Sequence, residues 1–135
     1  MKTLVYTFLI VVAVVSPVWS AICKCDATVE LEEGEIDVLI LPVANLSDCS
    51  QNIACAGYCK ETWTLATNGG DLTFVMQNGV TVGQQMCNEL NDYGAPTIGP
   101  HTAYVYYNLC SGPWIYDGMS TMQDLCCQDA VNVAC

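Results

Sequence analysis

The sequence lacks arginine, and its 135 residues include only one histidine and three lysines against fourteen aspartates and glutamates. After the first twenty residues only Lys24 and Lys60 remain as cations, so that part of the chain has a net charge of about −12. A surface with this charge repels phosphate backbones and anionic lipid headgroups. We therefore expect neither nucleic acids nor membrane surfaces as partners, and instead expect cations or a basic extracellular protein or matrix component.

The scarcity of histidine also limits the catalytic chemistry that the chain can support. A histidine-based triad could use only His101, and no Gly-x-Ser-x-Gly motif accompanies it. The run CysCysGlnAspAlaVal is similar to the cysteine-pair helix of secreted phospholipases, but Gln128 stands where their histidine precedes the aspartate. A glycosidase with paired carboxylates needs a longer cleft than such a small chain builds. The sequence thus predicts no enzymatic activity, no cofactor, and no catalytic or metal site.

Only one long apolar run is present, and it lies near the first residue. Residues Leu4 to Val15 follow a lysine and precede Pro17, Ser20 and Ala21, which is the layout of a secretory signal peptide. The run is shorter than the roughly 20 residues that cross a bilayer. We expect cleavage after Ser20, giving a signal peptide over 1–20 and one secreted domain over 21–135. We expect no further membrane span and no lipid anchor in that domain, because no second long apolar run follows.

Cysteine is abundant in the part that follows. The ten cysteines are Cys23, Cys25, Cys49, Cys55, Cys59, Cys87, Cys110, Cys126, Cys127 and Cys135. Ten in about 115 residues is close to the density of a disulfide scaffold. The even count predicts five disulfides and no free thiol, since oxidation outcompetes thiolate metal sites in secreted chains. The pairing stays open, because ten cysteines allow roughly 945 connectivities.

The segment from Thr28 to Pro42 alternates apolar and acidic side chains on both sides of Gly34. The apolar set is Val29, Leu31, Ile36, Val38 and Ile40, and the acidic set is Glu30, Glu32, Glu33, Glu35 and Asp37. This pattern predicts a β-hairpin with one apolar and one acidic face, ended by Pro42. The carboxylates lack the spacing of a calcium loop, so we interpret them as a solvated face.

Cysteine spacing also predicts how a helix attaches to a strand. Ser47 or Asp48 is suited to cap a helix that begins near Cys49 and stops before Asn68-Gly69-Gly70. Cys55 and Cys59 would lie on one face of this helix and pin it to a sheet. Cys23 and Cys25 would share one face of a strand and hold it against two neighbouring segments.

The middle of the chain allows two arrangements. Leu72 to Met76 has the composition of a short strand, and Asn78-Gly79 is typical of a tight hairpin turn that leads into Val80 and Val82. After this turn comes a helix over Gln84–Asp92, or alternatively one helix over the whole of Thr81–Asn91. The residues leave the two open.

The C-terminal block predicts a strand that is held by disulfides. An aromatic run containing Tyr104, Tyr106 and Tyr107 leads to Cys110, and a Gly-Pro-Trp turn follows. Adjacent cysteines bond to each other only with difficulty, so Cys126 and Cys127 should point apart and tie two other segments to this one. The predicted fold class is therefore α+β, a small disulfide-rich domain with a hairpin, short helices and a C-terminal strand fixed by disulfides.

Three aromatic side chains are the candidate interaction residues. Trp114 could be a binding hot spot, but we expect it to pack over a disulfide as part of the core. Tyr104 and Tyr106 belong to a run with one inward and one outward face. Asn45-Leu46-Ser47 is an N-glycosylation acceptor in a predicted exposed loop.

The order of the cysteines resembles a known family. Cys-x-Cys at 23 and 25, Cys49, the pair 55 and 59, Cys87, Ala103-Tyr104 before Cys110, Trp114, Cys126-Cys127 and Cys135 follow one another as in the small secreted follicle-cell proteins of insect ovaries. These are associated with the egg covering. The resemblance implies an extracellular structural or interaction protein without catalysis.

Two other classes remain as alternatives. An early cysteine cluster and a late Cys-Cys are also similar to three-finger receptors and toxins, in which Cys126 would close an upstream loop and Cys127 would pair with Cys135. There, however, the terminal cysteine lies nearer the pair and is followed by asparagine. A venom or salivary ligand with a fold of its own is the other alternative.

Overall fold

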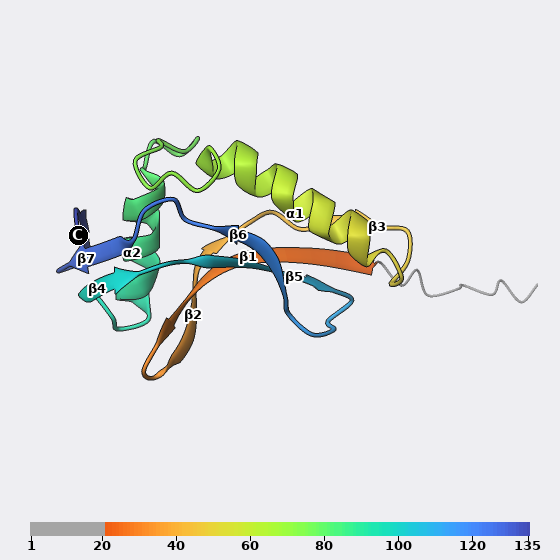
Figure 1. Ribbon diagram of the computed structural model, residues 1–135, viewed down its shortest axis with the longest axis horizontal. Helices are drawn as coiled ribbons and strands as arrows, with labels where there is room; N and C mark the ends of the chain where they lie inside the picture. Colours follow the sequence, from red (N-terminus) through yellow and green to blue (C-terminus); the bar gives the residue numbers. More distant parts are fainter. Residues whose placement is uncertain (1–20) are drawn as a thin grey trace, which may run out of the picture.

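The computed structural model describes residues 21–135, which build two antiparallel β-sheets and two helices (Figure 1). The predicted signal peptide lies outside the described residues. In chain order the elements are β1 (Ala21–Leu31), β2 (Gly34–Ile40), β3 (Ala44–Leu46), α1 (Asn52–Thr67), α2 (Val82–Asp92), β4 (Ile98–His101), β5 (Tyr104–Leu109), β6 (Ile115–Ser120), β7 (Leu125–Gln128) and β8 (Val131–Val133). The predicted α+β class is confirmed.

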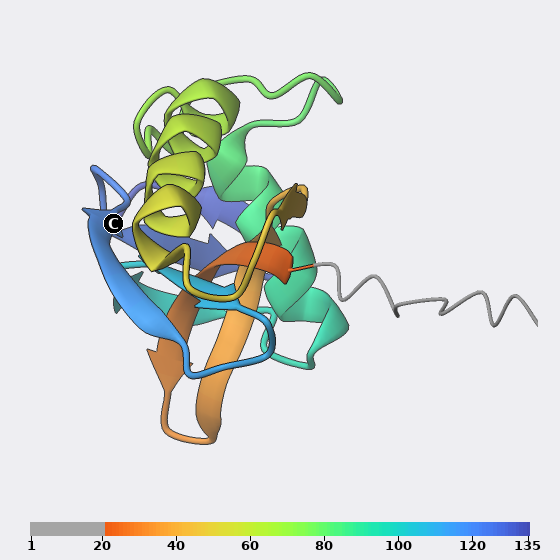
Figure 2. The same cartoon turned by 90° about the vertical axis from the view of Figure 1, so that its right-hand side faces the viewer.

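The larger sheet is organised around β1. Its strand order is β2-β1-β5-β6, and β3 pairs with the first three residues of β1. The β1–β2 pair is the predicted hairpin, and β5 is the predicted aromatic strand. Helix α1 lies along one face of this sheet, whereas α2 packs against β2 (Figures 1 and 2). One face of the β1–β5–β6 portion is therefore turned away from α1.

Two disulfides fix α1 to β1. Cys23–Cys55 and Cys25–Cys59 both have Cα–Cα distances of 5.5 Å. Two residues of a strand advance by about 6.6 Å and four residues of a helix by about 6 Å, so the two spacings match when helix and strand run in the same direction. The predicted attachment of α1 is confirmed. The expectation of two neighbouring segments is wrong, because both strand cysteines reach the same helix.

The ends of α1 were predicted with unequal success. The helix begins at Asn52 rather than near Cys49, and no side chain caps its first turn. Asp48 instead accepts a hydrogen bond from the backbone N–H of Ser50 at 2.8 Å, which commits its carboxylate to the preceding turn. Cys49 is bonded to Cys110 at the end of β5. The helix stops as predicted, with Asn68 in the left-handed conformation at φ 53°.

The segment 72–76 is not the strand that we predicted. The backbone carbonyls of Leu72 and Phe74 accept hydrogen bonds of 2.9 Å from the first two N–H groups of α2. Thr81 completes this start, because its hydroxyl accepts a hydrogen bond from a backbone N–H of the first turn at 3.2 Å. The segment therefore caps a helix, and its β-pairing is limited to an isolated antiparallel bridge between Val75 and Thr81 around the predicted Asn78-Gly79 turn. The alternative of one continuous helix is correct.

The smaller sheet, β4-β7-β8, holds the C-terminal block against α2. Cys127 on β7 is bonded to Cys87 on α2, and Cys126 is bonded to Cys135. The adjacent cysteines point apart as predicted, but only Cys127 reaches another segment, because Cys135 belongs to the same block. This pairing is the reverse of the one expected for a three-finger protein, so that alternative is wrong.

A β-bulge changes which side chains of β2 face the core. Val38 is an extra residue, since its neighbours Asp37 and Leu39 pair with consecutive residues of β1. Beyond the bulge Leu39 is buried and Ile40 is 63 % exposed. Our expectation that Ile40 continues the apolar face is therefore wrong.

The main core lies between the helices and the sheet side that faces them. Trp63 of α1, Met86 and Leu90 of α2 and Leu125 of β7 are all buried in it. α1 buries only one side chain per turn, so its two disulfides supplement a narrow contact. Within residues 21–135, no helix combines the length and apolarity needed to cross a membrane.

Candidate binding surface on the open face of the larger sheet

The sheet face turned away from α1 has its own set of side chains. Cys23 and Cys25 face α1, so the alternating residues Lys24 and Asp26 face the other way. The strand register places Asp26 opposite Tyr106, and Tyr106 opposite Tyr116 of β6. We call this surface the open face, and its charged and tyrosine side chains are Lys24, Asp26, Glu30, Glu35, Asp37, Tyr104, Tyr106 and Tyr116.

Three tyrosines form its aromatic part. The ring centroids of Tyr104 and Tyr116 are 5.7 Å apart with nearly perpendicular planes, and those of Tyr106 and Tyr116 are 5.8 Å apart. Tyr104 is 42 % exposed and Tyr116 is 51 % exposed. Partial burial, and then the carboxylates of Glu35 and Glu30, raise the pKa of Tyr106. The Tyr106 phenol therefore stays neutral at physiological pH, and the exposed rings of Tyr104 and Tyr116 present aromatic surface to solvent.

Asp26 is the most unusual residue of the open face. Its side chain is 7 % exposed, although it lies on the side of the sheet that no helix covers. Burial, and then the negative charge of Asp37, raise the pKa of its carboxyl to about 6, while Lys24 acts in the opposite direction. The Asp26 carboxyl makes no hydrogen bond to any residue between 21 and 135. A buried carboxylate without a partner costs folding free energy.

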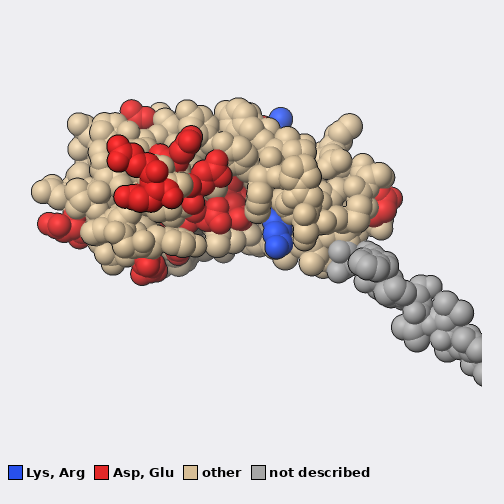
Figure 3. Space-filling view, turned by 90° about the horizontal axis from the view of Figure 1, so that it is seen from below, with Lys and Arg blue, Asp and Glu red and all other residues tan. Residues whose placement is uncertain are grey.

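Further carboxylates continue the face along the hairpin. Asp37 pairs with Thr28 across the strands, and burial raises the pKa of the Asp37 carboxyl. Glu30 and Glu35 are direct cross-strand partners and are both exposed. Seen from the side opposite α1, many of the acidic side chains gather into one patch, and others lie singly near the edges of the view (Figure 3). The open face therefore combines an aromatic cluster with concentrated negative charge.

A second buried carboxylate, that of Asp117, lies on the helix-facing side of the same sheet. Asp117 follows Tyr116 in β6, so its side chain points the opposite way, toward α1. It is 7 % exposed, and its Oδ2 atom has no hydrogen-bond partner among the described residues. Burial raises the pKa of this carboxyl, and Lys60 of α1 acts in the opposite direction. Asp117 is thus as buried as Asp26, but it lies on the opposite face of the sheet.

The structure brings together two of the three predicted interaction residues. Tyr104 and Tyr106 both lie on the open face, whereas Trp114 belongs to the loop between β5 and β6. Our expectation that Trp114 is a core residue is wrong, because its side chain is 48 % exposed and belongs to neither core cluster. Asn45 is exposed, but on the short strand β3 rather than in a loop.

The sequence reasoning missed Asp26 and Tyr116. The alternation Cys23-Lys24-Cys25-Asp26 indicates the face on which Asp26 lies. Both cysteines bond to one helix, so Lys24 and Asp26, which alternate with them, point to the opposite face. Tyr116 carries no such signal, because its place on the open face depends on an irregular register between β5 and β6.

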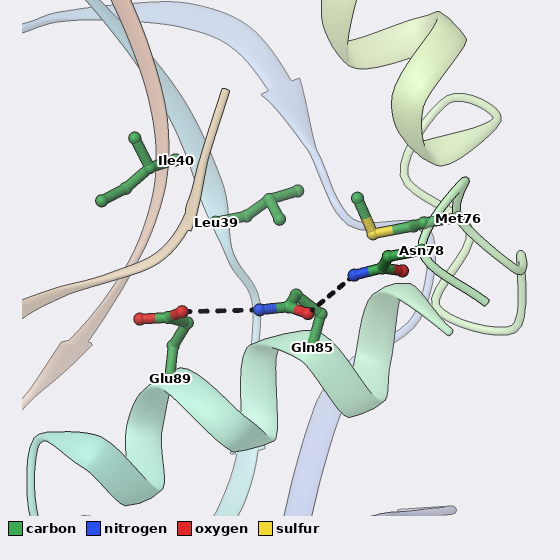
Figure 4. A pocket seen from close by; sticks show the side chains of 6 residues that line it. All are labelled: Leu39, Ile40, Met76, Asn78, Gln85 and Glu89. Atoms are coloured by element: carbon green, nitrogen blue, oxygen red, sulfur yellow. Dashed lines mark hydrogen bonds between the residues drawn. The ribbon is translucent and has the colours of Figure 1, made fainter. Parts of the chain in front are cut away.

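A separate hollow lies between the end of β2 and α2. It has a volume of about 250 Å³ and is lined by Leu39, Ile40, Met76, Asn78, Gln85 and Glu89 (Figure 4). Gln85 donates a hydrogen bond to Glu89 at 3.4 Å and accepts one from Asn78 at 3.2 Å. The polar groups of this hollow therefore already bind one another, and it is a weaker candidate than the open face.

A larger hollow of about 750 Å³ separates the hairpin tip from the loop before β4. Its lining includes Glu32, Glu33, Tyr93 and His101. The Nδ1 atom of His101 lies 2.8 Å from the carbonyl oxygen of Gly99, so this histidine is held by its own loop. Nowhere in residues 21–135 do three or more histidine, cysteine or acidic side chains gather in a way that could hold a metal ion.

Comparisons of the chain with protein-family models, with curated proteins and with solved structures gave no match.

Proposed function

We propose that this chain is a secreted, acidic, non-enzymatic protein that acts outside the cell by binding a protein or matrix component through its open face. The observation that carries the proposal is the pairing of all ten cysteines into five disulfides, with none left free in the described chain. Disulfides persist in oxidising compartments and are rare in the cytosol.

The open face supports the binding part of the proposal. Large aromatic side chains are enriched where proteins bind one another, because they bury much area and lose little conformational freedom. Tyr104 and Tyr116 are both substantially exposed and pack edge to face on a sheet anchored by disulfides. A rigid scaffold that displays aromatic rings is suited to recognition.

We further propose an association with the egg covering, on the basis of the resemblance to follicle-cell proteins. That proposal rests on the cysteine order together with Ala103, Tyr104 and Trp114. The alternative is that the protein is a ligand secreted by a venom or salivary gland.

One localisation experiment tests the extracellular role and the tissue together. An antibody raised against residues 21–135 is used on sections of ovary, venom gland and salivary gland of the source animal, with preabsorbed antibody as the control. We expect staining in the extracellular layer between follicle epithelium and egg. Staining of a gland lumen would replace the egg-covering role with the alternative. Staining confined to the cytosol of any tissue would contradict the extracellular role itself.

A further inference from the structure

We infer that the open face binds an extended, arginine- or lysine-bearing segment of a partner protein, with one cationic side chain lying against Asp26 beside Tyr106. This inference deepens the proposed function and rests on it, because it names the chemistry of the partner that the face recognises.

The first step is the state of Asp26. The residue is 7 % exposed, and its carboxyl makes no hydrogen bond within the described chain, although its oxygens are not fully buried as Oδ2 of Asp117 is. Asp37 lies near enough to disfavour its ionised form further. An isolated buried carboxylate is unfavourable, and a cation that arrives with its own hydrogen-bond donors removes that cost. The open face therefore contains a negative group that the folded chain leaves for a ligand to pair.

The second step is the aromatic surroundings of this carboxylate. Tyr106 lies directly across the strands from Asp26, and Tyr116 lies directly across from Tyr106. Aromatic ring faces attract guanidinium and ammonium groups within about 6 Å of the ring centroid. Rings beside a carboxylate thus favour an organic cation over a metal ion, for which the described residues offer no cluster of ligating side chains.

The third step is the shape and the charge of the surface. Small ligands prefer concave, enclosed pockets, whereas these residues are spread across four neighbouring strands of a sheet. Glu30, Glu35 and Asp37 extend the negative charge from Asp26 along the hairpin, and Lys24 is the one cation of the face. A surface of this length fits several basic side chains presented in succession by an extended segment. Its charge also disfavours anionic partners.

The test uses the secreted full chain with its disulfides intact and a fluorescent twelve-residue peptide of alternating arginine and threonine. The control peptide replaces each arginine with citrulline, which keeps the shape and removes the charge. We expect fluorescence anisotropy to show saturable binding of the arginine peptide, at least tenfold weaker binding of the citrulline peptide, and weakening of the former by salt. Equal binding of the two peptides would overturn the inference.

Two matched variants assign the binding to the face. Asp26→Asn removes one negative charge from the open face, whereas Asp117→Asn removes an equally buried charge on the other side of the same sheet. We expect Asp26→Asn and Tyr116→Ala each to weaken arginine-peptide binding at least tenfold, and Asp117→Asn to leave it unchanged. Circular dichroism spectra identical to that of the unmodified protein verify that the variants fold. Equal losses for the two asparagine variants would overturn the assignment.

A further arm separates this inference from the proposed function. If spermine, a flexible polycation without a peptide backbone, binds as tightly as the arginine peptide at equal charge concentration, the extended-segment inference is wrong. A protein that is secreted with five disulfides but binds none of these probes contradicts only this inference. A protein that stays inside the cell contradicts the proposed function instead.

Discussion

At the scale of single residues, the burial of Asp26 has a consequence for stability. Its pKa in the folded chain is about 6, above the ordinary value of 3.8, so folding favours the protonated carboxyl. The contribution of Asp26 to the free energy of unfolding is therefore most favourable below pH 4, and it is lost as the pH rises through about 6. Asp37 and Lys24 are the charged groups that modify this titration, and Asp37 has the larger effect.

Asp26→Asn should accordingly stabilise the protein at neutral pH. After allowance for solvent screening, we expect the free energy of unfolding to rise by about 1–2 kcal/mol at pH 7.5 and to change little at pH 3.5. Urea denaturation at the two pH values measures both quantities. A variant less stable than the unmodified protein at pH 7.5 would show that the carboxylate has a partner that stabilises its charge.

The same residue shows where sequence reasoning stopped. Alternation along the chain can place Asp26 on the face opposite the cysteines. The residues directly opposite it on the two neighbouring strands, however, are Tyr106 of β5 and Ile40 of β2. Tyr106 lies eighty residues further along the chain, and Ile40 lies beyond the β-bulge of β2. Pattern alone does not reveal such pairings.

At the scale of elements, the connection after α1 depends on a close approach of two backbones. A Cβ atom added at Gly70 would lie 2.5 Å from the carbonyl oxygen of Ser120 and 3.0 Å from the Trp63 ring. Gly69, its neighbour, also has a positive φ, but a Cβ atom there would meet nothing within 4 Å. Substitution at Gly69 therefore tests backbone strain alone, whereas substitution at Gly70 tests backbone strain together with steric crowding.

Gly70→Ala should destabilise the fold more than Gly69→Ala. Both substitutions place alanine in left-handed backbone, at a cost of about 1 kcal/mol. Only Gly70→Ala also forces β6 away from the end of α1, which should add about 2 kcal/mol or more. Thermal unfolding of the two variants measures the difference. Equal melting temperatures would mean that the two backbones are not closely packed at Gly70.

Element boundaries were predictable where local chemistry decides them. Asn68 and the two glycines after it end α1 because they readily adopt positive φ. The start of α1 was not predictable, since Cys49 is held by Cys110, sixty-one residues away. The prediction of a strand over 72–76 was wrong for a similar reason, because backbone carbonyl groups of this segment accept hydrogen bonds from α2 rather than from a strand.

At the scale of the whole molecule, the cysteine count predicts the class of fold and the number of disulfides but not their pairing. The pairing depends on matched geometry, such as two strand positions that meet two helix positions between β1 and α1. Sequence reasoning identified the members of each pair of positions correctly. The sequence does not show that the two strand cysteines bond to the two helix cysteines. This pairing depends on the direction of α1 relative to β1, which the sequence does not give.

The disulfides should not contribute equally to stability. Cys25–Cys59 closes a sequence separation of 34 residues between buried positions, whereas Cys126–Cys135 closes only 9 residues at the exposed chain end. Chain entropy assigns about 4 kcal/mol to the first loop and about 3 kcal/mol to the second. Removal of the first also leaves α1, which buries only one residue per turn, bonded to β1 through Cys23–Cys55 alone.

Replacement of both cysteines of each pair by serine tests this ranking. We expect the Cys25/Cys59 double variant to melt at a clearly lower temperature than the Cys126/Cys135 double variant, and to lose arginine-peptide binding as β1 and the open face loosen. The Cys126/Cys135 variant should retain binding, because its disulfide lies within the smaller sheet. If that variant were the less stable one, the C-terminal block rather than the β1–α1 attachment would hold the fold together.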